Sequence, residues 1–599
     1  MSVLSKITIL INKKPFKSFQ HISIFENLYG IDRFEISSRY DALEELDGFL
    51  IEKSKDFLGF PIVIQTKIKV KDVEEDGINF QGYITEIQSS RSGMSDYDQI
   101  IISGGSKEIV LNRKATNKAF IDKTLDEIVK EVLKDYEIKT KIKARNKQKF
   151  PYIVQFEESD LEFLKRLSIR YGEWFFFNGK ELIFGELPVV ERFLTIGYNL
   201  EDFRYELRVN PVKFNILSLD SLNMDVHNYQ AGKSKIESNL NTYGKHALKM
   251  SKELYSNEGK DYYEHLNVDE KDYKKGLEQV GEMQESVDAV NLTNLSGNST
   301  NGFLSAGVHV KINCIKQDGK SRMDYGKYIV TSIQHSIENT LIYKNNFSAI
   351  PAETTIPENT DPYFVRTTSN QLGMIADNKD PKKLGRVKVN FWWMEGNQAS
   401  PWIKVASPYT SGGSGFYFIP SKGTRVLIAF EGGNVEKPYC LGTLYDEASG
   451  PDKAWAGNKD DSNAKIHAIR TTSGQTIELH DDSGNEKIRI YDTGGKNEIT
   501  LDSAKGEITI KATNKLSIES QDKLSIHAKE IEIKADSGLK IEAGQKLEQK
   551  GMDIIIDATE GAVNISSTLG DLKASGMKSA EISSTAGITS VKGMTVKLN

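Results

Sequence analysis

The chain has 599 residues, of which 38% are hydrophobic and 27% charged, and its formal net charge at pH 7 is −6. That length leaves room for three or four domains with sizeable cores. So small a net charge on so large a surface gives no reason to expect nucleic acid or an anionic membrane as the main partner. Two cysteines far apart, Cys314 and Cys440, fit neither a disulfide framework nor a metal-ligand spacing, which favours two reduced thiols and assembly in the cytoplasm.

The first twelve residues, MSVLSKITILIN, have a short apolar run but lack the long apolar region and the small-residue cleavage site of a signal peptide. No stretch of about 18 apolar residues occurs, which is the length that a membrane-spanning helix needs. We therefore expect a β-strand at the N-terminus, no signal peptide and no membrane span.

Residues 1–110 alternate apolar and polar side chains between Gly and Asp turns, for example at Ile62, Ile64 and Phe80. A period of two residues is typical of strands with one buried face, so we expect an antiparallel β domain.

Two short helices are predicted next by their start signals. Thr124 is followed three residues later by Glu127, and Ser159 by Glu162, and both pairs precede apolar residues at helical spacing. A Ser or Thr before a helix and a Glu at its third position can each bond the other's backbone N–H, which forms a capping box.

The next segments return to strands, with one exception. Residues 172–186 predict a hairpin with an aromatic first strand, and strands resume over 303–350. Between them, 250–290 is dense in Lys, Glu and Tyr with weaker helical periodicity, which favours an exposed helical insertion. The prolines around 356–362 predict a linker.

Residues 363–446 are punctuated by glycines, with a turn at Asp380 and Pro381, and hold about five short strands. Turns every 8 to 12 residues suit a small closed barrel of the OB type. Many OB folds bind oligonucleotides, but the clustered Lys and Arg among exposed aromatics that such a groove needs are missing, so we predict no nucleic-acid partner. Residues 447–470 read as a second linker.

Residues 506–599 read as a string of eight-residue units, GEITIKAT NKLSIESQ DKLSIHAK, without an aromatic residue, proline or cysteine. Aliphatic residues alternate within each unit and recur between units, with one residue dropped before Ile531. Alternation indicates strands, and the longer period indicates a repeated strand and corner. The predicted inward-facing positions are Ile508, Ile510, Leu516, Ile518, Leu524, Ile526, Ile531, Ile533, Leu539 and Ile541.

Two or three small aliphatic side chains per unit are too few to form a core within one chain. Single-chain solenoids use coils of about 20 residues, so an eight-residue unit indicates one face from each of several chains. Three chains wound around one axis form the simplest closed arrangement, and its narrow interior leaves no room for an aromatic side chain. We therefore predict a homotrimeric, triple-stranded interwound β-helix, or needle, over 471–599. A disordered Lys/Glu/Ser tail is the alternative, which the regular alternation disfavours.

Four stretches carry recognisable motifs: YIVQFEESDLEFLKRLSIRYGEWFFF (152–177), the segment 328–352 with YIVTSIQHSI, the segment 377–445, and TTSGQTIELHDDSGNEKIRIYD (471–492). They resemble, in this order, the tail-hub signature, the end of the hub, the spike OB domain and the start of the β-helix in the VgrG family of type VI secretion spikes. The hub signature matches at Tyr152, Gln155, Glu158, Ser159, Asp160, Phe163, Arg166, Leu167 and Gly172, and the OB motif at Asp380, Pro381, Gly385, Arg386, Val387, Pro420, Gly423 and Gly442. We find no counterpart for 220–300.

The resemblance implies a mainly β fold in which 1–355 forms phage tail hub-like domains with two β-barrels and helical insertions, and 363–446 is the OB-fold base of the spike. It implies a homotrimer that caps a tube of Hcp-like protein, contacts baseplate components, carries effector proteins and pierces target membranes. Assembly would occur in the bacterial cytoplasm before secretion or injection. A PAAR-type tip protein would bind at the C-terminal end, on Met594, Thr595, Val596, Lys597, Leu598 and Asn599. The spike of a phage baseplate or of an extracellular contractile particle shares this architecture and remains the alternative.

The sequence predicts no catalytic residue, metal site or cofactor. It contains no H-E-x-x-H, nucleophile elbow or Gly-rich phosphate loop, and its histidines lack the close pairing of metal ligands. The interval 446–470 is too short for a catalytic domain, and we expect no toxin domain after the needle. Asp481 and Asp482 favour a turn, with an ion site as the alternative. A cell-wall hydrolase, which would need paired carboxylates in a cleft, is the least favoured function.

Overall fold

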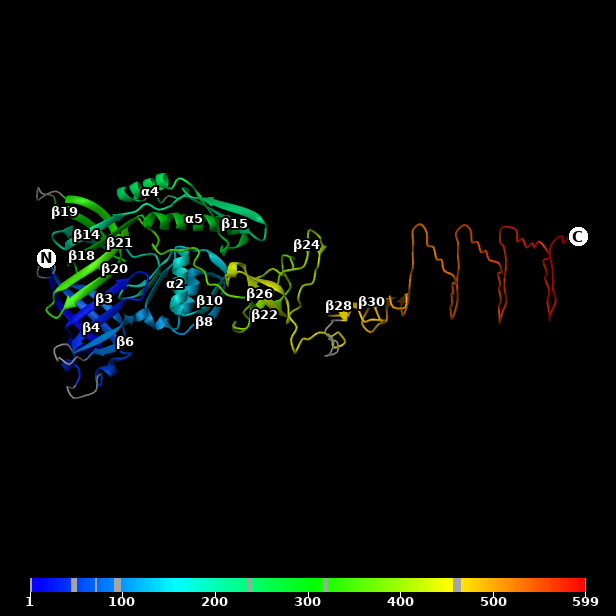
Figure 1. Ribbon diagram of the computed structural model, residues 1–599, viewed down its shortest axis with the longest axis horizontal. Coiled ribbons are helices and arrows are strands. Elements are labelled where there is room, and N and C mark those ends of the chain that lie inside the picture. The colour runs from blue at the N-terminus through cyan, green and yellow to red at the C-terminus, as the bar shows by residue number, and fades with distance from the viewer. Residues whose placement is uncertain are drawn as a thin grey trace. The chain divides into compact units, whose positions relative to one another are not determined.

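The computed structural model describes residues 3–44, 51–70, 73–90, 98–234, 236, 240–315, 322–455 and 465–597. They fall into two units, Met1–Asp452 and Lys453–Asn599, which we treat separately. Strands predominate in both, so the predicted mainly β fold is confirmed (Figure 1). Among the described residues, no helix has the length and apolar character needed to cross a bilayer.

A thirteen-stranded sheet forms the body of the first unit, as far as the structure describes it. Its spatial order is β19-β13-β14-β18-β21-β20-β3-β4-β7-β6-β5-β1-β2, with a further pairing of β19 with β20. The strands are β1 (Val3–Ile11), β2 (Lys14–Phe16), β3 (His21–Asn27), β4 (Arg33–Arg39), β5 (Pro61–Val70), β6 (Val73–Ser90), β7 (Gln99–Ser106), β13 (Glu191–Ile196), β14 (Leu200–Leu207), β18 (Thr293–Ser299), β19 (His309–Ile315), β20 (Arg322–Glu338) and β21 (Tyr343–Pro351).

The long strand β20 belongs to both halves of this sheet. Its first part, Arg322–Ile329, pairs with β19 and closes a six-stranded ring. Its second part, Ser332–Glu338, pairs along the same edge with β3, from which the other strands continue as a sheet that stays open in the described pairings. The two barrels predicted for 1–355 are therefore one closed ring and one open sheet that share a strand, because β20 is long enough to leave one and enter the other.

The predicted alternation holds in the open half: Ile62, Ile64 and Phe80 are buried in one cluster. The ring has a separate core that includes Leu194, Val330 and Phe347.

Both predicted capping boxes are present. Thr124 caps α1 (Leu125–Leu133) with Glu127, and Ser159 caps α2 (Asp160–Tyr171) with Glu162. The two helices pack with β8 (Thr116–Thr124), β9 (Thr140–Lys143) and β10 (Lys149–Glu158) around one core. The predicted hairpin is β11 (Trp174–Phe177) and β12 (Leu182–Gly185), which are buried and antiparallel.

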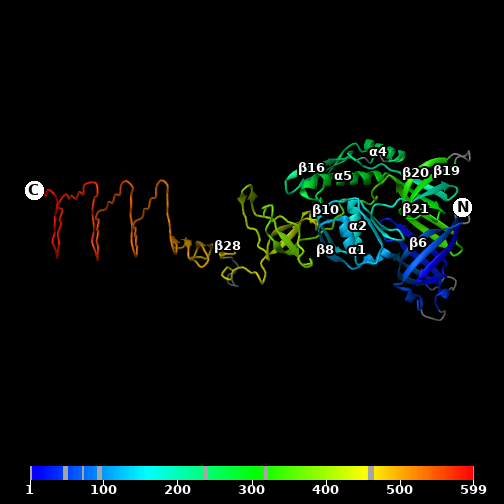
Figure 2. The ribbon, with the colours of Figure 1, turned by 180° about the vertical axis from the view of Figure 1, so that it is seen from behind.

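The region without a counterpart in the resembled family is mixed and not simply helical. Preceded by β15 (Phe214–Asp220), it contains β16 (Asp225–Gln230), α4 (Thr242–Leu254), β17 (Gly259–Tyr262), α5 (Tyr273–Val290) and the sheet strand β18. The predicted helical stretch 250–290 begins inside α4 and also includes the strand β17. β17 is a strand because it pairs in parallel with the free edge of β15. Figures 1 and 2 show α4 and α5 together on the flank of the first unit where β15 and β16 lie.

The OB segment is a four-stranded sheet, β23-β22-β26-β27, with a projecting hairpin. Its strands are β22 (Gln371–Asp377), β23 (Lys388–Phe391), β26 (Arg425–Phe430) and β27 (Pro438–Thr443), and the hairpin is β24 (Thr410–Ser411) with β25 (Ser414–Gly415). In place of the fifth predicted strand, isolated bridges join Ile403 to Val387, which directly precedes β23, and Val405 to Cys440 of β27. Pro401 and Pro408 flank this segment, and proline cannot donate to a strand ladder.

The OB domain shares a core with the hub. Tyr152, Val154 and Phe156 of β10 pack in the same buried cluster as Phe391 and Trp393 of the OB segment. The predicted linker 356–362 therefore joins two parts that are already packed together.

The second unit opens with an antiparallel meander of five described strands, β28 (Ile466–Arg470), β29 (Thr476–His480), β30 (Lys487–Tyr491), β31 (Glu498–Asp502) and β32 (Glu507–Lys511). The predicted linker 447–470 contains β28. This segment forms a strand because it pairs along its whole length with β29. Residues 456–464 of that stretch lie outside the described residues. Beyond Lys511, the described residues 512–597 wind in open loops without a paired strand (Figure 1).

Candidate functional site

The meander β28–β32 presents one face made almost wholly of aliphatic side chains. The register places Ile469, Ile477, Ile490, Ile499 and Ile510 opposite one another across all five strands, and beside them a second row of His467, Leu479, Ile488, Leu501 and Ile508. The seven aliphatic residues of this face on β28–β31 are 37–46% exposed in the single chain. This face is therefore only half covered within its own chain.

The opposite face of the same sheet has its partners inside the chain. The buried carboxylate of Glu478 accepts hydrogen bonds from the Tyr491 hydroxyl (2.6 Å) and the Trp455 indole N–H (2.9 Å), and Arg489 lies 3.6 Å from it. Burial works against ionisation of Glu478, but these hydrogen bonds outweigh it and lower its pKa. The sheet thus has a satisfied polar face and an uncovered apolar face.

The ten predicted inward-facing residues of the octads are 52–73% exposed in the single chain. Their sequence keeps the apolar–polar alternation of a strand, yet no described strand pairs with residues 512–597. Backbone N–H and C=O groups in extended segments normally pair with a neighbouring strand. The octads therefore carry side chains and backbone groups suited to partners that their own chain does not provide among its described residues.

Of the predicted tip residues, Met594, Thr595, Val596 and Lys597 are exposed. Leu598 and Asn599 lie outside the described residues. Tip binding remains a prediction.

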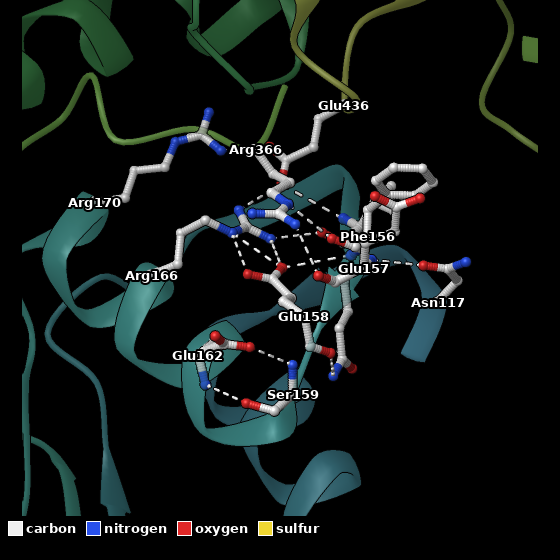
Figure 3. Close-up of polar contacts among 12 residues, drawn as sticks. Asn117, Phe156, Glu157, Glu158, Ser159, Glu162, Arg166, Arg170, Arg366 and Glu436 are labelled. Atoms are coloured by element: carbon white, nitrogen blue, oxygen red, sulfur yellow. Dashed lines mark hydrogen bonds and ion pairs between the residues drawn. The ribbon is translucent and has the colours of Figure 1, made fainter. Parts of the chain in front are cut away.

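A second cluster of interest, the Glu436 junction, ties the OB domain to the hub and to the unmatched insertion. Figure 3 shows Arg166 of α2 between the carboxylates of Glu158 and Glu436. The Arg166 Nη2 atom lies 2.6 Å from Glu158 Oε1, and Nη1 lies 3.4 Å from Glu436 Oε1. Arg170 of the same helix forms an ion pair with the other oxygen of Glu436.

The insertion joins the Glu436 junction through its loop before α5. Arg170 donates to the carbonyl oxygen of His265 (2.9 Å), and Asn267 donates to both Glu436 Oε2 (3.0 Å) and the carbonyl oxygen of Tyr152 (2.6 Å). One buried carboxylate thus receives side chains from the hub helix and from the insertion.

The charges of the Glu436 junction balance, since two guanidinium groups face two carboxylates. All four side chains are at most 5% exposed. Burial opposes ionisation of Glu436, but attraction by Arg170 and Arg166 outweighs it, so its pKa is lowered. Removing one member of a buried ion pair leaves an uncompensated charge, which costs about 3–5 kcal/mol. The junction is therefore suited to hold the OB domain rigidly on the hub.

The sequence pointed to part of these sites. Glu158 and Arg166 belong to the hub motif, whereas Glu436 and Arg170 were missed, because they lie 266 residues apart and no local pattern links them. The part of the apolar face on β28–β31 was also missed, whereas Ile508 and Ile510 on β32 were among the predicted inward-facing residues. Its signal was present in the alternating segments IHAIR, TIELH, KIRIY and EITLD.

Among the described residues, no group of three or more His, Cys, Asp or Glu side chains is arranged to hold a metal ion. Cys314 and Cys440 are both free.

Comparison with known proteins identifies two domains. Residues 371–445 match the family model of the type VI secretion system/phage-baseplate injector OB domain, and residues 53–186 match that of the phage tail baseplate hub.

Similar curated proteins are the actin cross-linking toxin VgrG1 of Vibrio cholerae (23% identical over 66% of this chain and 36% of the relative) and the type VI secretion system spike protein VgrG3 of the same species (21% over 64% and 39%). The chain thus covers little more than a third of either relative. Among solved structures, the Francisella PdpA-VgrG complex in its half-lidded form has a similar fold, with a TM-score of 0.52 and 10% identity over 85% of this chain and 88% of that one.

Proposed function

On the premise that this chain is a spike protein of the VgrG family, we propose that three copies wind their octads into the needle of a contractile injection machine. The observation that carries the proposal is the end of strand pairing at Lys511, while strand alternation continues. Up to that point each strand finds its partner in its own chain. Beyond it, partners have to come from other copies.

The two aliphatic rows of β28–β32 lead into the octads, since Ile508 and Ile510 end the rows and begin the repeat. In a three-stranded needle these side chains face one interior. Burying an Ile or Leu fully is worth about 1.5–3 kcal/mol, so side chains already half covered would each contribute about 1–2 kcal/mol per chain. The same association would pair the backbone groups of residues 512–597, for which the described part of a single chain provides no strand.

In this proposal the hub caps a tube of Hcp-like protein, the OB domain holds the base of the needle, and the C-terminal residues receive a PAAR-type tip protein. Sheath contraction would then drive the assembly through a target membrane with attached effectors. Assembly would take place in the bacterial cytoplasm, with baseplate components as further partners. The Glu436 junction supports this role because a spike has to transmit axial force from hub to needle without hinging.

The spike of a phage baseplate or of an extracellular contractile particle is the second candidate, because the matched OB family itself covers both type VI and phage-baseplate injectors. Gene context separates the two: membrane-complex genes beside this one favour type VI secretion, and tail-fibre genes favour a free particle. The toxic activity in the name of one relative is not proposed for this chain, which covers 36% of that protein. A peptidoglycan hydrolysis assay on the purified chain tests the remaining enzyme hypothesis.

Light scattering on the purified full-length chain tests the proposal. We expect a mass of three times 67.2 kDa. A mass of one chain, together with a β-rich circular dichroism spectrum, would contradict the interwound needle. A secretion assay adds a second readout: loss of the gene should abolish release of the tube protein into the medium.

A further inference from the structure

A cavity of about 630 Å³ lies in the first unit between the open half of the sheet, the hairpin β11–β12 and the ring. Its first wall comes from β1, β5 and β6, its second from the hairpin, and its third from the start of β13 and the loop before β19. Pockets that hold small molecules have volumes of about 300–1,000 Å³. The cavity is therefore large enough for a small molecule, and neither the needle nor the Glu436 junction involves it.

Four cationic side chains line this cavity, which we call the basic cavity: Lys6 of β1, Lys67 of β5, Lys180 of the hairpin loop and Arg192 of β13. The only carboxylate among the described lining residues is that of Asp76, which forms an ion pair with Lys67. None of the other three cations forms an ion pair with a residue that the structure describes, and the neighbouring Glu191 pairs with Lys327 instead. The basic cavity thus has three positive charges in excess, in a chain whose net charge is −6.

Two β-bulges determine where the lysines of the sheet lie. The register of β1 with β5 shifts between Leu4 and Lys6, which places Lys6 directly opposite Lys67. The register of β5 with β6 shifts between Gln65 and Lys67, which places Lys67 opposite Asp76. Like charges directly opposite each other destabilise a strand pair, and bulges are frequent beside functional sites, where they re-aim a side chain. The two bulges therefore hold a pair of lysines together at a cost that a bound anion would offset.

The other two cations are also held at the cavity wall. The side-chain amide of Asn79 in β6 donates to the carbonyl oxygen of Gly179 (2.9 Å), which fixes the hairpin loop beside Lys180 against the sheet. Gly179 has φ +80°, and a Cβ there would lie 2.2 Å from the Asn79 carbonyl oxygen, so only glycine fits. The guanidinium carbon of Arg192 lies 5.7 Å from the centre of the Phe303 ring, a cation–π contact that restrains its charge.

We propose that the basic cavity binds a small multivalent anion through its phosphate groups. Phosphate combines a high charge with several acceptor oxygens, and lysine and arginine are its usual partners in proteins. An acidic peptide spreads its charges along an extended chain, at about 3.3–3.6 Å per residue, and suits a long groove. Four cations that converge from three walls suit a compact anion better. A free polyphosphate and the phosphate chain of a nucleotide share this chemistry.

This inference goes beyond the proposed spike function and does not depend on it, because every lining residue belongs to one chain. Isothermal titration calorimetry on the full-length chain, with tripolyphosphate in a phosphate-free buffer of low ionic strength, tests it. We expect saturable binding at one site per chain. Arg192→Gln and Lys180→Gln should each raise the dissociation constant about fivefold to tenfold, because each removes one charge at contact distance.

Two further variants make the test specific. Asp76→Asn should lower the dissociation constant by a similar factor, because it removes the carboxylate of the cavity, and damage to the fold would not produce such a gain. Lys14→Gln is the matched control: it removes an exposed lysine of the same sheet outside the cavity and should leave the dissociation constant unchanged.

Adenosine triphosphate distinguishes the two sources of phosphate. Tighter binding than that of tripolyphosphate supports a nucleotide, and equal binding supports recognition of the phosphates alone. The proposal is overturned if no saturable binding occurs, if Lys14→Gln weakens binding as much as Arg192→Gln does, or if a hexaglutamate peptide binds more tightly than tripolyphosphate. None of these outcomes affects the needle, which light scattering tests separately.

Discussion

The substitution Ile518→Asp probes one of the predicted inward-facing positions of the needle. Ile518 is 63% exposed in the single chain, so more than half of its surface is still open to a partner. Full burial of isoleucine is worth about 1.5–3 kcal/mol, which makes the missing part about 1–2 kcal/mol per chain. In a symmetric trimer this loss occurs three times at one level, about 3–6 kcal/mol in total.

The carboxylates add a larger cost. Three aspartates facing one narrow interior cannot all stay ionised, and each charge removed from water without a partner costs several kcal/mol or is neutralised by proton uptake. We therefore expect a destabilisation on the order of 10 kcal/mol per trimer at neutral pH. It should be smaller near pH 4, where the new side chains take up protons.

Ser517→Asp is the matched control. It introduces the same carboxylate one residue away, and because strand side chains alternate, this one points outward. The assay is resistance of the trimer to heat and detergent, followed by light scattering and gel mobility at both pH values. If the two variants lose resistance equally, or if neither does, the assignment of inward and outward positions in the octads is wrong.

Other predictions concern the first unit. Glu436→Gln should lower the free energy of unfolding by about 3–5 kcal/mol in a denaturant titration, because Arg166 and Arg170 then face one carboxylate. The control is Glu431→Gln, which removes a more exposed ion pair with Lys437 and should lower the free energy of unfolding by less than about 1 kcal/mol. Because the pKa of Glu436 is lowered in the folded protein, its contribution to stability is present above the ordinary carboxyl pKa and is lost as the pH falls below that value. The stability of Glu436→Gln should therefore fall less steeply with acidification than that of the unchanged protein. Burial raises the pKa of Glu108 to about 7, so its contribution is full below pH 4.5 and is lost as the pH rises through 7; thermal melts of Glu108→Gln should lack that decline. Asp380→Asn should destabilise the OB domain by about 1–3 kcal/mol, since Asp380 accepts from the backbone N–H groups of Lys382 and Leu384 and pairs with Arg386. Asp377→Asn keeps an oxygen that can still accept from the Lys379 N–H, so it should cost less in the same melt. Unchanged melting of Glu436→Gln or Asp380→Asn relative to its control would contradict the contact concerned, and a decline that persists in Glu108→Gln would contradict the role of Glu108.

Local signals predicted the local features. The capping boxes at Thr124 and Ser159 and the hairpin 172–186 could be read from the sequence because residues a few positions apart determine them. The turn at Asp380 was equally visible, since its carboxylate bonds residues two to six positions ahead.

Long-range features could not be read in this way. Nothing in the residues of β20 states that one half pairs with β19 and the other with β3, because β3 lies more than 300 residues earlier in the chain. The strand β17 was hidden for the same reason, as the free edge of β15 decides its conformation. The octads are the opposite case: their repeat is so regular that it indicates a shared interior, for which we propose that other copies of the chain supply the partners.

Hydrogen–deuterium exchange on the assembled full-length protein tests the central claim most directly. A single chain offers the amides of residues 512–597 no described strand partner, whereas the needle pairs them with other copies. We expect those amides to be protected as strongly as the amides of β28–β32. If they exchange as fast as an unstructured peptide while light scattering reports three chains, the copies associate elsewhere and the octads do not form the needle.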